Sequence, residues 1–356
     1  MARRVALHIG PRKTATTYLQ RVLQQCVESG VLPAECYPIR TRGRLDHNHV
    51  PGLIDLARGE GEIGLQADAW TEQDGSDARA LLEAVAATDA EVILSAEALS
   101  VLRPSGADAV ITALAPAPVD VVVTVRDLGR VLPSSWQQHM RNGNIESYAD
   151  YLALRAEERS ARLDRTDLHR GFWRAYRYGE LVRRWAAAAR SVSVVTVPAS
   201  SKDPAEVWRR FIAAAKLTEL PHEPPVVEED RANISLTGAE TFALQGLNIA
   251  ARGNGLGRRE VRDWHRKLLR RGWTDRADRG PRLGLPPEML PVVREWAEED
   301  RADLATSGVP IFGVLDDLTV GPDNPGVPDA NAVAAAAGAA LMRALQGRQT
   351  RDGGDA

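Results

Sequence analysis

Residues 5–27 read VALHIGPRKTATTYLQRVLQQCV, and this stretch decides the fold of the chain. Val5, Leu7 and Ile9 occupy every second position, which is typical of a β-strand. After a loop at residues 10–17, apolar residues recur with the spacing of one helix face, at Leu19, Val22, Leu23, Cys26 and Val27. The chain is therefore predicted to open with a strand, a tight loop and a helix.

Three later segments have the composition of buried strands. They cover residues 91–95, 119–125 and 191–197. β-Branched residues dominate the second and third, as in sheets that are covered on both faces. Helical patterns separate the segments, one at residues 178–189 and one opened by the N-cap pair Asp203 and Pro204. Because strands that alternate with helices form parallel sheets, we predict an α/β fold with a central parallel sheet.

The composition excludes several classes of protein. Among the 356 residues, 45 Lys and Arg oppose 48 Asp and Glu, and this net charge of −3 argues against a nucleic-acid partner. The two cysteines, Cys26 and Cys36, provide no disulfide framework and favour a reducing compartment. The longest run of small apolar residues, 332–342, falls short of the ~20 residues that a membrane helix needs. We therefore expect a cytoplasmic protein with no stable membrane insertion.

We predict one α/β domain over residues 1–320, followed by a C-terminal segment over residues 321–356. This segment begins with a Pro- and Gly-rich stretch and continues as an Ala-rich helix with a flexible tail from Gly347. The sequence carries no signal for the oligomeric state. Mostly helical insertions into the α/β domain are expected at about residues 40–90, 140–175 and 250–285, with short helices near 52–57 and 78–87.

The loop at residues 10–17 has the layout of an anion-binding site. The helix that follows it begins with backbone N–H groups that have no partner inside the helix, and the helix dipole favours an anion there. Lys13 adds a positive charge, and hydroxyl donors follow at Thr14, Thr16 and Thr17. A basic helix start that binds nothing is the alternative interpretation.

This loop is not a Walker A motif. Only Pro11 and Arg12 separate Gly10 from Lys13, whereas that motif has four residues and a second glycine before its lysine. The shorter loop fits a single phosphate group. No predicted strand ends in the aspartate that would help to hold Mg²⁺, so we expect no metal site. A P-loop-type kinase or nucleotide hydrolase is the less favoured alternative for this reason.

A second candidate anion site follows the most hydrophobic predicted strand. Arg126 comes directly after residues 119–125, and ligands of α/β sheets bind beyond the carboxyl ends of the strands. Ser134 lies eight residues further on, where we expect a helix over residues 134–140 to begin, so that its hydroxyl and free N–H can face the same anion. A surface arginine and a serine N-cap are the alternative. Together with the loop at residues 10–17, this site suits one nucleotide with phosphates at its 5′ and 3′ positions.

At these two motifs the sequence resembles the cytosolic-type sulfotransferases that use 3′-phosphoadenylyl sulfate (PAPS), and more closely their bacterial relatives. LHIGPRKTATTYLQ, at residues 7–20, resembles the 5′-phosphosulfate loop of that family. TVRDLGRVLPSSWQQHMRNG, at residues 124–143, resembles its 3′-phosphate motif. Weaker similarity occurs in VILSAEAL, at residues 92–99, and RANISLTGAETFALQGLN, at residues 231–248.

The resemblance implies a P-loop NTPase-like fold and transfer of a sulfonate from PAPS to a hydroxyl or amine. The acceptor would be a small molecule, a glycan or a lipid, and the product nucleotide 3′,5′-phosphoadenosine. The resemblance further implies that Arg126 and Ser134 hold the 3′-phosphate and that Lys13 offsets charge on the leaving oxygen. The residues implied at the 5′-phosphosulfate are Arg12, Lys13, Thr14, Ala15, Thr16 and Thr17, with Tyr18 stacked on adenine.

The sequence departs from the family in two places. Ala15 stands where the family usually has glycine, which is costly only if the backbone there needs a positive φ. A nucleotide-binding protein without catalysis is therefore a further alternative. The family's C-terminal Arg-Lys-Gly loop is missing. Residues 252–282 carry eleven basic and four acidic residues, a net charge of +7, and either replace that loop or form a solvated helical face.

Transfer to a hydroxyl is helped by a general base, for which there are three candidates. Glu97 follows the strand at residues 91–95 on the correct edge of the sheet, although the dipole of a helix start explains a carboxylate there equally well. His49 is its rival and resembles a recurrent histidine of the bacterial members. His139, close to the second motif, is the third candidate. His8 alternates with apolar residues and is interpreted as a core histidine.

Overall fold

The computed structural model describes residues 1–38, 40–41, 44–45, 49–57, 76–161, 171–199, 203, 205–217, 219–226, 236–257, 260–261, 280–321 and 324–352. The chain groups into two compact units. The first unit comprises Met1–Leu128, Glu158–Val227 and Glu295–Thr319. The second unit comprises Gly129–Glu157, Glu228–Arg294 and Val320–Ala356. The second unit thus takes in the expected insertion at residues 250–285, the first half of that at residues 140–175, and the C-terminal segment.

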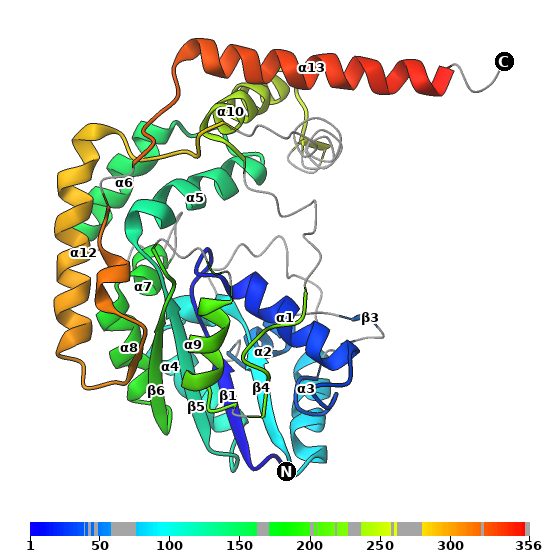
Figure 1. Cartoon of the computed structure of the whole chain (residues 1–356), viewed down its shortest axis with the longest axis vertical. Helices are drawn as coiled ribbons and strands as arrows, with labels where there is room; N and C mark the ends of the chain where they lie inside the picture. Colours follow the sequence, from blue (N-terminus) through cyan, green and yellow to red (C-terminus); the bar gives the residue numbers. More distant parts are fainter. Residues whose placement is uncertain are drawn as a thin grey trace. The chain divides into compact units, whose positions relative to one another are not determined.

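A five-stranded parallel sheet forms the centre of the first unit, in the order β4-β1-β5-β6-β7 (Figure 1). Its strands are β1 (Arg4–His8), β4 (Glu91–Ser95), β5 (Val119–Val125), β6 (Ser191–Thr196) and β7 (Ile311–Phe312). The predicted α/β class is confirmed, as are the four predicted strands. β7 escapes prediction because two residues carry no periodic pattern. A separate antiparallel ribbon pairs β2 (Arg40–Thr41) with β3 (Arg44–Leu45).

Helices cover both faces of this sheet. In the first unit they are α1 (Thr16–Glu28), α2 (Val50–Ala57), α3 (Ser76–Ala87), α4 (Pro104–Ala113), α7 (Phe172–Tyr176), α8 (Tyr178–Ala186) and α9 (Glu206–Ala214), with the 3₁₀ helices η3 (Glu97–Val101) and η7 (Leu315–Leu318). Helices α1 and α9 share one core cluster with the strand residues Ala6, Ile93, Val122 and Val195. α8 contacts β5 and β6 outside that cluster and therefore packs on the opposite face. Coverage on both faces explains why the strands are almost continuously apolar.

The order of the strands creates a topological switch point beside β1. The chain leaves β1 for β4 on one side of it, whereas it leaves β5 for β6 on the other side. The connections that follow β1 and β5 therefore diverge from two adjacent strands. In open α/β sheets such a switch point, at the carboxyl ends of the strands, is where ligands bind. Both predicted anion-binding segments begin at this point, after His8 and after Val125.

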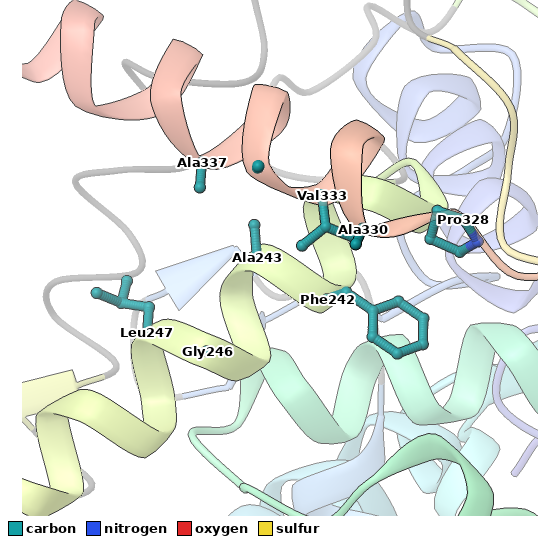
Figure 2. A pocket seen from close by; sticks show the side chains of 9 residues that line it. Phe242, Ala243, Gly246, Leu247, Pro328, Ala330, Val333 and Ala337 are labelled. Atoms are coloured by element: carbon teal, nitrogen blue, oxygen red, sulfur yellow. The ribbon is translucent and has the colours of Figure 1, made fainter.

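The second unit is helical in the part that the structure describes. Its helices are α10 (Gly238–Gly253), η6 (Pro287–Met289), α13 (Ala330–Asp352) and most of α5 (Leu128–Arg141) and α6 (Tyr148–Ser160), whereas α12 (Leu290–Ala305) has residues in both units. α10 and α13 lie side by side, and Ala243 and Val333 point toward one another across an apolar groove (Figure 2). The groove is lined by Phe242, Ala243, Gly246, Leu247, Pro328, Ala330, Val333, Ala334 and Ala337. It contains no titratable side chain and therefore no candidate for acid–base chemistry.

Three element boundaries differ from the sequence-based expectations. α5 begins at Leu128, so Ser134 lies in the middle of the helix, one residue after the internal Pro133. The backbone N–H of Ser134 therefore belongs to the helix, and the expected free N–H is corrected. α9 begins at Glu206 rather than after Asp203, whose carboxylate accepts a hydrogen bond from the Ala205 N–H at 2.9 Å. Pro204 lies outside the described residues.

One further boundary differs from expectation, at the C-terminal helix. α13 continues to Asp352, past Gly347, where the sequence suggests that a tail begins. No helix within the described ranges is long and apolar enough to cross a membrane. The side chains of Trp136, Trp185 and Trp208 are fully buried.

Candidate functional site

The loop after β1 has an unusual backbone. Lys13 and Ala15 adopt the left-handed conformation, with φ values of 68° and 66°. Left- and right-handed residues in alternation turn successive backbone N–H groups toward one concavity, which is a recurrent anion-binding arrangement. A positive φ costs conformational free energy in any residue with a side chain, and such strained residues cluster at functional sites. The position of Ala15 therefore does need a positive φ, and alanine is the costly choice there.

Gly10 allows the loop to approach β5 closely. A Cβ atom at this position would overlap the hydroxyl of Thr124 and lie 2.9 Å from Nε2 of His8. Both neighbours are buried in the sheet and cannot move aside. Gly10 is thus required by packing, because only a residue without a side chain fits between the ends of β1 and β5.

Two of the three loop threonines serve the loop itself. The Thr14 hydroxyl donates to the Pro11 carbonyl at 2.5 Å and is fully buried. The Thr16 hydroxyl donates to the carbonyls of Gly10 and Pro11, at 3.3 Å each. These hydrogen bonds close the turn, and the role of the two hydroxyls as ligand donors stays a prediction. Thr17 is exposed.

The first turn of α1 offers its backbone N–H groups to a ligand. Ala15 is the N-cap residue and contributes no side-chain hydrogen bond, and the first turn contains no acidic residue. The positive end of the helix dipole is therefore not offset by the helix itself. Arg12 is exposed and Lys13 is half-buried beside this turn, so the surroundings add positive charge. Tyr18 packs partly buried against the cluster between α1 and α9.

Arg126 lies against this loop. One guanidinium nitrogen of Arg126 (Nη1) donates to the Lys13 carbonyl at 3.0 Å. The register explains the contact, because His8 is paired with Val122 and β5 continues to Val125. Arg126 thus leaves the sheet beside the loop. Ser134 belongs to the second unit, and its pairing with Arg126 at one phosphate stays a prediction.

Two tyrosines that sequence reasoning missed hold these two segments. The Tyr176 hydroxyl donates to the Arg12 carbonyl at 2.6 Å. The Tyr178 hydroxyl donates to the Arg126 carbonyl at 2.5 Å and accepts from the Arg126 N–H at 3.3 Å. The available signal was that Tyr178 lies on the apolar face of a helix, where a buried tyrosine hydroxyl needs a partner.

A chain of hydrogen bonds runs beneath the loop, through His8. The ring of His8 contacts the Ser95 hydroxyl through Nδ1 at 2.9 Å and the Thr124 hydroxyl through Nε2 at 3.1 Å. Thr124 contacts Thr14 at 2.8 Å, and Thr14 donates to the Pro11 carbonyl. Since a carbonyl can only accept, each donor in the chain must point toward the loop, which places the proton of His8 on Nε2.

His8 supports the loop as a neutral core residue. Burial lowers its pKa to about 3, so the ring carries no charge near neutral pH. The ring also makes an edge contact with Phe211 of α9. These contacts agree with its interpretation as a satisfied core histidine.

Glu97 lies at the same edge of the sheet, on the other side of β1 from Arg126. It opens η3 directly after β4, and the neighbouring Ala96 N–H donates to the His8 carbonyl at 2.9 Å. The buried amide of Gln20 donates to Glu97 Oε2 at 3.4 Å and to the Ser95 hydroxyl at 3.0 Å. Glu97 is only partly buried, so its carboxylate can reach a ligand at the crevice.

The two other candidate bases have both ring nitrogens engaged. His49 contacts the Pro38 carbonyl through Nε2 at 2.7 Å and accepts the Ser95 N–H through Nδ1 at 3.0 Å. Burial lowers the pKa of His49 to about 4, against the effect of these hydrogen bonds. In the second unit, His139 contacts Glu146 through Nε2 at 3.3 Å and the Asn144 side chain through Nδ1 at 3.2 Å. Neither ring has a nitrogen left to take a proton from a substrate.

Within the part of the chain that the structure describes, no group of three or more His, Cys, Asp or Glu side chains could hold a metal ion. Most of the basic stretch at residues 252–282 lies outside the described residues. Comparison with family models, with curated proteins and with solved structures gives no match. The chemistry of the crevice is therefore the basis on which a function can be assigned.

Proposed function

We propose that the chain is a sulfotransferase that uses PAPS, with its donor site in the crevice between β1 and β5 and a P-loop-like sheet beneath it. The contact between the Arg126 guanidinium and the Lys13 carbonyl, at 3.0 Å, carries the proposal. It brings two independently predicted anion-binding segments, 113 residues apart in sequence, to one edge of the sheet. A nucleotide with two separate phosphate groups is a ligand that needs both segments at once.

The residues of the crevice fit such a donor. Left-handed Lys13 and Ala15 turn backbone N–H groups into the loop, and α1 adds the unpaired N–H groups of its first turn. These groups and the Lys13 ammonium would hold the 5′-phosphosulfate. Arg126, with a planar fork of donors, would hold the 3′-phosphate. Arg12 and the exposed Thr17 would contact the rim of the same site, and Tyr18 the adenine.

Bound there, PAPS would supply a sulfonate group that is activated by its phosphate leaving group. Lys13 would stabilise the negative charge that builds up on the oxygen of that leaving group, an effect that is strong when the charge is fixed in advance. Glu97 would accept the proton that the acceptor hydroxyl loses. The sheet order β4-β1-β5 suits these separate roles of Glu97 and Arg126, because the two residues follow the strands on either side of β1 and its loop. His49 and His139 take no part in the proposed step.

The acceptor in this proposal is a small molecule, a glycan or a lipid headgroup, and no metal ion takes part. The crevice is defined by residues of the first unit and gives no indication of the acceptor's shape. A panel that includes phenols, steroids, sugars and amines is therefore the appropriate screen for transfer.

A thermal-shift comparison tests the proposal. We expect 3′,5′-phosphoadenosine to raise the unfolding temperature without Mg²⁺, since a ligand at 100 times its Kd adds about 2.7 kcal/mol of stability. A shift with ATP that requires Mg²⁺, and none with 3′,5′-phosphoadenosine, would instead support a kinase or nucleotide hydrolase. Binding of 3′,5′-phosphoadenosine without transfer of sulfonate to any acceptor would support a binding protein that lacks catalysis.

A further inference from the structure

We infer that Tyr176 and Tyr178 are positioning residues of the donor site, each of which fixes the backbone of one anion-binding segment. The inference rests on the proposed function and extends it to residues that contact no ligand themselves. Tyr176 is the last residue of α7, and Tyr178 is the first residue of α8. The two rings lie 6.4 Å apart, and both side chains are buried.

Tyr176 fixes the peptide unit between Arg12 and Lys13. Its hydroxyl donates to the Arg12 carbonyl at 2.6 Å. The carbonyl of Arg12 and the N–H of Lys13 belong to the same planar trans peptide and point in opposite directions. Holding that carbonyl therefore holds the Lys13 N–H in the orientation that the loop presents to an anion. Lys13 has a φ of 68°, which an unsupported loop would tend to relax.

Tyr178 fixes the backbone on both sides of Arg126. Its hydroxyl accepts the Arg126 N–H at 3.3 Å and donates to the Arg126 carbonyl at 2.5 Å. Burial raises the pKa of Tyr178 well above its ordinary value, so the hydroxyl keeps the proton that it donates. Because the peptide units on both sides of Arg126 are held, the orientation of its Cα–Cβ bond is fixed. The guanidinium group that extends from it then has fewer positions to sample.

The link between the two tyrosines is itself anchored. Arg177 is both the C-cap residue of α7 and the N-cap residue of α8. Its guanidinium group donates to the Arg159 carbonyl and to Glu180, the latter at 3.2 Å. One short turn thus sets the spacing between the loop after β1 and the segment after β5. A ligand that spans both segments depends on that spacing, whereas a ligand that uses one segment does not.

Two nucleotides that differ by one phosphate separate the roles of the tyrosines. Calorimetry would measure 3′,5′-phosphoadenosine and adenosine 5′-monophosphate, which lacks the 3′-phosphate, on wild type, Tyr176→Phe and Tyr178→Phe. We expect Tyr178→Phe, which loses both of its hydrogen bonds to Arg126, to weaken binding of 3′,5′-phosphoadenosine about fivefold to tenfold and to leave binding of the monophosphate unchanged. Tyr176→Phe should weaken the binding of both nucleotides by a similar factor.

Tyr148→Phe is the matched control. The Tyr148 hydroxyl is also buried and donates to a backbone carbonyl, that of Gly284, at 3.1 Å in the second unit. This variant loses the same kind of hydrogen bond and should bind both nucleotides as wild type does. A merely structural role for Tyr176 and Tyr178 predicts that all three variants lower the unfolding temperature and leave the affinities for both nucleotides unchanged.

The outcomes distinguish this inference from the proposed function. Wild-type binding of 3′,5′-phosphoadenosine, with unchanged affinities in both tyrosine variants, overturns the inference and leaves the proposed function standing. Equal losses for both nucleotides in Tyr178→Phe also overturn the assignment of that residue. No binding of either nucleotide to the wild-type protein overturns the proposed function and the inference together.

Discussion

Replacing Ala15 with glycine should stabilise the protein. Ala15 has a φ of 66°, a conformation that costs a residue with a side chain about 1–2 kcal/mol. Glycine avoids this cost but gains about 0.4–1 kcal/mol of conformational freedom in the unfolded chain. The difference is a net stabilisation of about 1 kcal/mol. In urea, with m of about 2 kcal/mol/M, the midpoint of unfolding should rise by about 0.5 M.

An alanine-to-glycine substitution inside a helix should have the opposite effect on stability. Ala302 is exposed in the last turns of α12, where the backbone is helical. Ala302→Gly should destabilise the protein by about 1 kcal/mol, the usual cost of glycine inside a helix. Urea titrations of the two variants beside the wild type provide the measurement. If Ala15→Gly loses as much stability as Ala302→Gly, the claim that the backbone at Ala15 is strained is refuted.

Three other predictions concern the loop and the residues beneath it. Gly10→Ala should lower the unfolding temperature sharply, because the added methyl group would overlap the Thr124 hydroxyl; an unchanged temperature would contradict this packing. Lys13→Ala should reduce sulfonate transfer much more than binding of 3′,5′-phosphoadenosine. Equal losses of transfer and of affinity would show that Lys13 only binds the nucleotide. Stability should fall with acid, because the pKa of His8 is about 3 and that of His49 about 4 in the folded protein, against 6.5 when unfolded. The unfolded chain then takes up protons that the folded chain excludes, which lowers the free energy of unfolding by about 2 kcal/mol per histidine at pH 5 relative to pH 7. Equal free energies of unfolding from urea titrations at the two pH values would contradict the neutral, buried state of these histidines.

The sequence was sufficient for features that depend on local pattern. Alternating apolar residues predicted β1, and β-branched runs predicted β5 and β6, because buried parallel strands need such residues. The loop after β1 was identified from its place between a strand and a helix. Arg126 was found in the same way, since its position follows from where β5 ends.

Features that depend on contacts between distant segments could not be predicted. The hydrogen bond from Tyr176 to Arg12 joins residues 164 positions apart, and no local pattern encodes it. The Thr14 hydroxyl contacts Thr124 of β5, which becomes visible only once β1 and β5 are paired. Ser134 is expected at a helix start from sequence, whereas α5 begins at Leu128 and contains Pro133 as an internal proline.

Calorimetric titration of 3′,5′-phosphoadenosine into wild type, Arg126→Ala and Arg183→Ala tests the central claim most directly. Arg183 is exposed on α8 and provides the same change of charge away from the crevice. We predict that Arg126→Ala weakens binding about ten- to hundredfold, the range for hydrogen bonds to charged groups, and that Arg183→Ala binds as the wild type does. Equal affinities for all three proteins would contradict the claim that the segments after β1 and β5 hold one nucleotide between them.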